Sequence, residues 1–193
     1  MGLHVGIDVG STNACVAVYA DNDDGSVSQE GGLRVLPTRA GNGDAYEAPW
    51  RRALDVFERL RAEGNGATVR SARVVGSGSR TLARTIHAPV ANTYRALAAA
   101  VGHLHPEART VLRIGAETSS FLGLHWDAGT DSPAIHDFAQ SGDCAAGTGS
   151  FLDTQAQRLG IPVEQIGEEV ERARGAARIA GRCSVFAESD MIH

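Results

Sequence analysis

The sequence predicts an α/β fold built in two halves, and three observations support this. Short runs that alternate apolar and polar residues, typical of strands, are interleaved with segments of helical periodicity. Small, glycine-containing turns follow two of the predicted strands, at residues 10–13 and 115–118. A third turn, residues 147–149, leads directly into a helical segment. We place the division between a first half, 1–106, and a second half, 107–193.

The first half is predicted to contain three strands, a helix, a strand and a second helix. Alternation predicts the strands, and apolar residues at helical spacing predict the helices. In chain order these segments are residues 4–9, 14–20, 33–37, 49–63, 71–75 and 90–103. Residues 21–32 and 39–48 are polar and rich in glycine, so we predict loops there. A Gly-Ser-Gly turn follows the fourth strand at residues 76–78.

The second half is predicted to start with three strands and to continue with helices. The strands are expected at 110–114, 119–126 and 135–138, and the helices after residue 147 and at 163–173. The first of these helices is predicted to pack through one apolar face, composed of Phe151, Leu152, Gln155 and Leu159. Glu188 and Asp190 are interpreted as part of a solvated segment.

Composition excludes several classes of function. A hydrophobic content of 42% suffices for a core, and no apolar run reaches membrane-spanning length. A net charge of −5 and an aromatic content of 5% argue against a nucleic-acid binder. Three cysteines without framework spacing, and no visible leader, predict a cytoplasmic protein. All 18 basic residues are arginine, which excludes a Walker-type phosphate-binding lysine.

The first turn, in the string GIDVGST, predicts a phosphate-binding loop. Gly10 permits the turn, and Ser11, Thr12, Asn13 and the local N–H groups can contact phosphate oxygens. Asp8 lies between apolar neighbours, where an unpaired carboxylate is costly, and a magnesium ion or its bound water would satisfy it. The alternative is a plain hairpin in which the aspartate bonds to its own turn.

Two strings each contain one cysteine, at Cys144 and Cys183. The helix that follows Cys144 would direct the N–H groups of its first turn towards that residue, and such an end attracts a thiolate or a phosphate. The alternative is that both cysteines are buried as small hydrophobic residues.

The strings CAAGTGSF and RCSVFAESD resemble those of the BadF/BadG/BcrA/BcrD-type ATPases, which activate 2-hydroxyacyl-CoA dehydratases and benzoyl-CoA reductases. The second string is especially similar to long, multidomain activases. The resemblance implies an actin/Hsp70/sugar-kinase (ribonuclease H-like) fold whose second lobe is incomplete. It also implies a homodimer that holds one [4Fe–4S] cluster through Cys144 and Cys183. The partners implied are a low-potential electron donor and an iron–sulfur acyl-CoA dehydratase or reductase.

The number of cysteines agrees with this resemblance. A four-iron cluster needs four thiolates, and the chain has three cysteines in total. Cys15 lies in an apolar strand pattern and is interpreted as a core residue. A two-fold dimer that contributes Cys144 and Cys183 from each copy supplies four thiolates.

The resemblance also assigns roles around a bound nucleotide. ATP or ADP is expected on residues 10–13 and on a second loop, Gly115 and Ala116, with the turn Gly147, Thr148 and Gly149 close to a bound group. Asp8 is expected to position Mg²⁺ and the attacking water, and Glu117 to orient that water. Arg113 replaces a carboxylate of the family pattern, and the family's adenosine loop would follow beyond His193.

Two alternative functions follow from these differences. The first is an interaction module that retains the cysteines but has lost turnover, which Arg113 and the absence of lysine favour. The second is a small-molecule kinase, because sugar kinases share the first phosphate loop. A kinase gives no role to Cys144 and Cys183.

Overall fold

A computed structural model describes residues 1–37, 48–62, 67–127, 129–130, 132–142, 148–181 and 183–192. The chain divides into two compact units, Met1–Leu97 and Ala98–His193. The division falls within a helix, α3 (Thr93–Leu104), and the boundary predicted at 106–107 stays a prediction. No helix among the described residues combines the length and apolar character needed to span a membrane.

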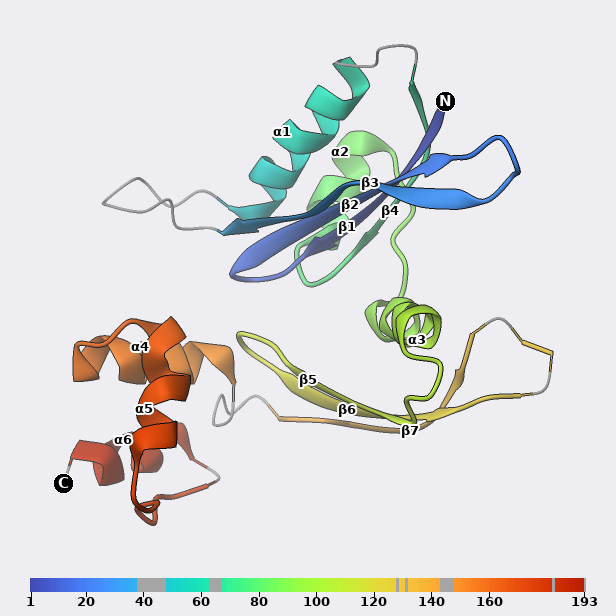
Figure 1. Ribbon diagram of the computed structural model, residues 1–193. Helices are drawn as coiled ribbons and strands as arrows, with labels where there is room; N and C mark the ends of the chain where they lie inside the picture. Colours follow the sequence, from blue (N-terminus) through green and yellow to red (C-terminus); the bar gives the residue numbers. More distant parts are fainter. Residues whose placement is uncertain are drawn as a thin grey trace. The chain divides into compact units, whose positions relative to one another are not determined.

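The first unit is a four-stranded sheet covered on one face by two helices (Figure 1). Its strands, in the order β3-β2-β1-β4, are Val27–Pro37, Asn13–Asp21, Gly2–Val9 and Thr68–Val75. The first three strands are antiparallel, and β4 runs parallel to β1. Helices α1 (Pro49–Ala62) and α2 (Ser79–Ile86) cover the face that holds the core.

Alternation along β1 and β2 places the core on one face of this sheet. Every second residue is buried, in the sets Leu3, Val5, Ile7, Val9 and Ala14, Val16, Val18, Ala20. These residues pack with Phe57 of α1 and Leu82 of α2. The opposite face carries polar side chains, including Asp8 and Cys15. Cys15 is half-buried and lies outside the core cluster, so its interpretation as a core residue was wrong.

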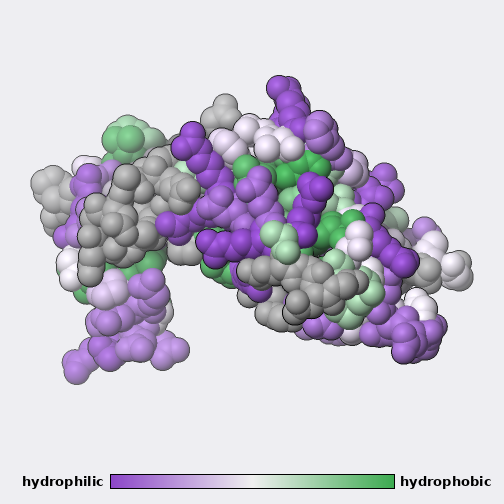
Figure 2. Space-filling view, turned by 90° about the horizontal axis from the view of Figure 1, so that it is seen from above, coloured by the Kyte–Doolittle hydropathy of each residue, from purple (hydrophilic) through white to green (hydrophobic). Residues whose placement is uncertain are grey.

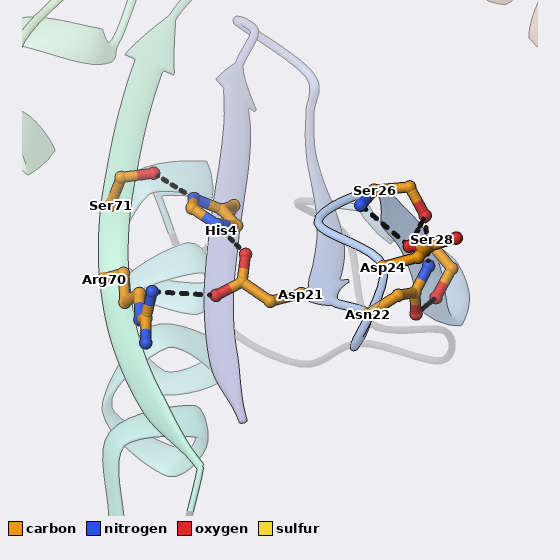
Figure 3. A network of polar contacts seen from close by, with 8 residues as sticks. All are labelled: His4, Asp21, Asn22, Asp24, Ser26, Ser28, Arg70 and Ser71. Atoms are coloured by element: carbon orange, nitrogen blue, oxygen red, sulfur yellow. Dashed lines mark hydrogen bonds and ion pairs between the residues drawn. The ribbon is translucent and has the colours of Figure 1, made fainter.

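Polar residues connect three strands on that second face (Figure 3). His4 contacts Ser71 Oγ through Nδ1 and Asp21 Oδ1 through Nε2, each over 2.8 Å. Arg70 forms an ion pair of 3.2 Å with the other oxygen of Asp21. Because His4, Asp21 and Ser71 lie on β1, β2 and β4, the network fixes the register of these strands at one end.

The segment predicted as a loop at 21–32 is mostly strand. A short turn at residues 22–26 connects β2 to β3, and Gly25 adopts a φ of 81° there. The carboxylate of Asp24 accepts hydrogen bonds from the backbone N–H of Ser26 over 2.9 Å and from its hydroxyl over 2.6 Å. The polar residues that suggested a long loop therefore form a compact turn, and the chain returns to the sheet at Val27.

The second unit contains a three-stranded antiparallel sheet and a set of short helices. The strands β5 (Thr110–Ile114), β6 (Ser119–His125) and β7 (Ala134–Gln140) lie in that order, with Leu122 and Leu124 buried. The helices are α4, η1, α5 and α6, which span Gly149–Leu159, Val163–Gln165, Ile166–Arg172 and Ser184–Ile192. One face of the molecule shows small hydrophobic areas between hydrophilic side chains (Figure 2).

The predicted apolar face of the first of these helices was wrong in part. Helix α4 buries Gln155, as predicted, and also Ala156, whereas Leu152 and Leu159 are 45% and 61% exposed. The segment of Glu188 and Asp190 is solvated in part and forms the helix α6, in which Asp190 is exposed and Glu188 is half-buried. Glu188 forms an ion pair with Arg158 of α4, and Asp190 accepts a hydrogen bond of 2.9 Å from the backbone N–H of Ala180. These contacts connect α6 to separate segments of the chain.

Candidate functional site

The first predicted loop is a tight turn between β1 and β2. The N–H of Gly10 donates a hydrogen bond of 2.9 Å to the carbonyl of Asn13, which closes the turn. Ser11 is half-buried, and Thr12 and Asn13 are exposed. The turn therefore presents two hydroxyl groups and an amide side chain next to the end of β1.

Asp8 is held just before this turn by the pairing of β1 with β2 and β4. Asp8 as a whole is half-buried. Its Oδ1 atom is fully buried and has no hydrogen-bond partner in the part of the chain that the structure describes. A buried carboxylate oxygen without a partner costs about 1–3 kcal/mol or more. Asp8 is thus a carboxylate suited to an additional ligand, such as a cation or its bound water.

A second turn, Gly76–Gly78, lies against the same end of β1. The N–H of Gly78 donates to the carbonyl of Val9 over 2.9 Å, and the N–H of Gly76 donates to Thr93 Oγ1 over 3.2 Å. Gly76 has a φ of 94°, and a Cβ atom at this position would collide with Asp8 Oδ1 and the Val9 carbonyl. No role at the site was predicted for this turn from the sequence. Its signal was the Gly-Ser-Gly string directly after β4.

Cys15 lies directly opposite Asp8 in the pairing of β1 with β2. Burial raises the pKa of the Cys15 thiol, and the negative charge of Asp8 raises this pKa further. The thiol is therefore held in its neutral form beside the carboxylate.

The second predicted loop is the turn between β5 and β6. The N–H of Gly115 donates to the carbonyl of Thr118 over 2.9 Å, and Glu117 is exposed on this turn. Arg113, at the end of β5, is half-buried, and its guanidinium group lies beside Gly115. A cation therefore occupies the position at which the resemblance led us to expect a carboxylate.

The start of α4 is bonded to this turn. The N–H groups of Gly149 and Ser150 donate to the carbonyls of Gly115 and Ala116 over 2.8 and 3.0 Å. Thr148 is fully buried at the N-cap position. We expected the first N–H groups of this helix to be free and to face Cys144. For the N–H groups of Gly149 and Ser150 this expectation was wrong. Backbone carbonyls already accept their hydrogen bonds.

Of the two cysteines predicted to bind the cluster, the structure describes only Cys183. Cys144 and Gly147 lie outside the described residues. Cys183 is half-buried, and its carbonyl accepts the N–H of Ala187 over 2.9 Å, which places Cys183 at the N-terminus of α6. In the described ranges no group of three or more His, Cys, Asp or Glu side chains could hold a metal.

Comparison with known proteins places the chain in a family. The model of the BadF/BadG/BcrA/BcrD ATPase family matches residues 5–193. The chain belongs to this family. Relatives in the family include the 2-hydroxyisocaproyl-CoA dehydratase activator of Clostridioides difficile, 27% identical over 188 residues, a match that covers 97% of this chain and 64% of the relative. The (R)-2-hydroxyglutaryl-CoA dehydratase activating ATPase of Acidaminococcus fermentans is also 27% identical. This match covers 97% of the present chain and 65% of that relative.

Solved structures of the family confirm the predicted fold class. The structure of component A of the Acidaminococcus fermentans (R)-2-hydroxyglutaryl-CoA dehydratase matches with a TM-score of 0.75 at 25% identity. This match covers 100% of the present chain and 67% of that chain. The present chain thus spans about two thirds of the length of these family members.

Proposed function

We propose that this chain is part of an ATP-dependent activator that passes a low-potential electron to an iron–sulfur acyl-CoA dehydratase or reductase. Family membership over residues 5–193 and relatives named as dehydratase activators support this function. The structural observation that carries it is Asp8, whose buried Oδ1 has no partner among the described residues and lies beside two glycine-containing turns.

Asp8 fits the carboxylate that a magnesium nucleotide requires. Magnesium prefers oxygen ligands and is usually bound through one or two carboxylates together with substrate phosphates. When bound, the ion supplies charge stabilisation for phosphoryl transfer. The absence of a side chain at Gly76 lets this turn lie close to Asp8 without a clash, and Ser11 and Thr12 supply hydroxyl donors for phosphate oxygens. Glu117 is a weaker candidate for orienting the attacking water.

Binding of ATP or ADP is assigned to the two turns. Gly10, Ser11, Thr12 and Asn13 would contact phosphate oxygens. Gly115 and Ala116 are proposed to contribute as well, although the N–H groups of Gly10 and Gly115 already donate within their own turns. In the proposed role, the hydroxyls and the remaining N–H groups of these turns hold the nucleotide while Asp8 holds the cation.

A [4Fe–4S] cluster shared by two copies is the proposed electron carrier. Cys144 and Cys183 from each copy would supply the four thiolates that such a cluster needs. Cys183 directly precedes α6, and the positive end of a helix dipole favours a thiolate. When bound, the cluster supplies one-electron transfer.

Anaerobic purification of the whole chain tests this assignment. We expect about four iron atoms and four sulfide ions per two chains, together with a dimer mass in solution. Cys183→Ser and Cys144→Ser should each abolish iron binding, whereas the matched variant Cys15→Ser should retain it. Iron-free protein after anaerobic reconstitution would contradict the cluster assignment.

Calorimetry with magnesium and ATP tests the nucleotide site separately. The wild type and Cys183→Ser should bind magnesium–ATP, and Asp8→Asn should bind it at least about tenfold more weakly, a loss of about 1.4 kcal/mol. No binding by the iron-loaded wild type would instead support a second candidate, an interaction module without turnover. The cation at Arg113, beside the second turn, favours that candidate.

A further inference from the structure

A basic groove lies along the outer edge of β4 in the first unit. It consists of two adjoining depressions of ≈ 520 and ≈ 590 Å³. Both are lined by His87 and Ala88, which follow the C-terminal end of α2. His87 itself adopts the left-handed conformation, with a φ of 55°, which turns the chain at the point where the depressions meet.

The charge of this groove is opposite to that of the whole chain. Its lining contains six basic residues: Arg61, Arg70, Arg73, Arg80, Arg84 and His87. No carboxylate among the described residues lines either depression, although the chain carries a net charge of −5. Arg70 is paired with Asp21. Arg61, Arg73, Arg80 and Arg84 have no ion pair in the described part of the chain.

The groove also borders a free strand edge. β4 is the last strand of its sheet, and the described residues pair with its outer side at a single bridge, between Val74 and Val90. The preceding residues of β4 therefore present backbone N–H and C=O groups on that side. Such an edge is a template for an extended segment that adds to the sheet.

Apolar residues complete the lining. Phe57, Val69 and Ile86 lie between the arginines in the larger depression. An extended peptide whose side chains alternate between acidic and apolar matches this combination, because successive side chains of a strand point to opposite sides. Arginine guanidinium groups bind carboxylates through paired hydrogen bonds.

We propose that this groove binds an extended, acidic segment of a partner protein, which adds to β4 as a further strand. A compact phosphate fits less well, since the groove adjoins the C-terminal end of α2, where the helix dipole is negative. The positive charge is instead distributed along the length of the groove, which suits several carboxylates in a row. The proposal goes beyond the proposed activator function and requires neither nucleotide nor iron.

Fluorescence anisotropy with labelled octapeptides tests the proposal on the whole chain. A peptide of alternating glutamate and valine should bind, and its lysine–valine counterpart should not. Binding should weaken with added salt and fall at least about tenfold in the double variant Arg73→Ser/Arg84→Ser. Arg95→Ser, an exposed arginine of α3 outside the groove, should leave it unchanged.

A second double variant and a methylated peptide complete the test. Arg61→Ser/Arg80→Ser should reproduce the loss if the first double variant unfolds. A glutamate–valine peptide methylated on every backbone nitrogen should bind poorly, because it has no N–H groups to donate to β4. Unchanged binding in both double variants, or undiminished binding of the methylated peptide, would overturn the proposal. So would inorganic phosphate displacing the peptide at equal concentration.

Discussion

The N–H of Gly149 donates a hydrogen bond of 2.8 Å to the carbonyl of Gly115. This bond joins the first residue of α4 to the turn between β5 and β6. A second bond, from Ser150 to Ala116, lies next to it. The turn proposed to bind nucleotide is therefore connected through its backbone to the helix that follows Cys144 in the sequence.

Gly149→Pro should destabilise the second unit by about 1–3 kcal/mol. Proline is favoured at the first position of a helix, and Thr148 already has the extended conformation that a residue before proline requires. The variant therefore removes the N–H and leaves the Gly115 carbonyl without this donor at little cost to the helix itself. Urea unfolding measures the change.

Gly149→Ala is the matched control for this variant. It retains the N–H, and a Cβ atom at residue 149 would make ordinary contacts of 3.4 Å or more. It should unfold close to the wild type. Equal stability of the proline and alanine variants would show that the bond to Gly115 contributes nothing.

Gly76→Ala should be more destabilising than Gly25→Ala. Both glycines have positive φ values, of 94° and 81°, so each alanine incurs the cost of that conformation, about 1 kcal/mol. A Cβ atom at Gly76 also meets the Val9 carbonyl and Asp8, whereas nothing lies within 4 Å of one at Gly25. Thermal unfolding of both variants measures the difference. The same midpoint for both would contradict the close packing of the Gly76 turn on β1.

The stability of the first unit should depend on Asp21 in a pH-sensitive way. The hydrogen bond from His4 is the largest cause that holds the pKa of Asp21 below its ordinary value of 3.8, and the charge of Arg70 acts in the same direction. A carboxyl group whose pKa is lowered by folding stabilises the fold at pH values above the pKa that the group has in the unfolded chain. This contribution is lost as the pH falls through the folded pKa.

Asp21→Asn should therefore lower the free energy of unfolding at neutral pH, with a difference that shrinks as the pH falls below about 4. Asp23→Asn, an exposed residue of the neighbouring turn, serves as the control and should leave the pH profile unchanged. Denaturant unfolding between neutral and acidic pH measures both. A constant difference for Asp21→Asn at all pH values would exclude this linkage.

Asp8→Asn should make Cys15 more reactive. The charge of Asp8 is the second cause of the raised thiol pKa, after burial, so its removal increases the thiolate fraction at a given pH. Iodoacetamide alkylation at mildly alkaline pH, followed by peptide mass spectrometry, should show faster modification of Cys15. Asp21→Asn, which alters the same sheet face at a distance, should not change the rate. An unchanged rate in Asp8→Asn would show that the charge of Asp8 does not act on the Cys15 thiol.

Much of this protein follows from its local sequence. Alternation predicted β1, β2 and β5, and the Gly10–Asn13 and Gly115–Thr118 turns appear where their residues indicated. Such features depend on near neighbours, whose spacing is visible in the chain. The two cysteine strings also indicated the family that the match over residues 5–193 now shows.

Other features depend on contacts between distant segments. The sequence suggested that Leu152 and Leu159 face the core together with Gln155, but α4 buries Gln155 and Ala156 and exposes the two leucines, because its orientation is decided by neighbours such as the turn at Gly115. Likewise, the ion pair of Glu188 with Arg158 and the hydrogen bond from Ala180 to Asp190 connect α6 to segments that local spacing does not indicate.

The sequence by itself determined the periodic elements, the glycine turns and the membership of the family, since short-range spacing carries all three. The tertiary structure alone decided that Gly76 lies against Asp8 and that β4 has a basic outer edge. The physical reason is that strand pairing and helix packing bring together residues far apart in the chain, and local patterns do not specify which ones meet.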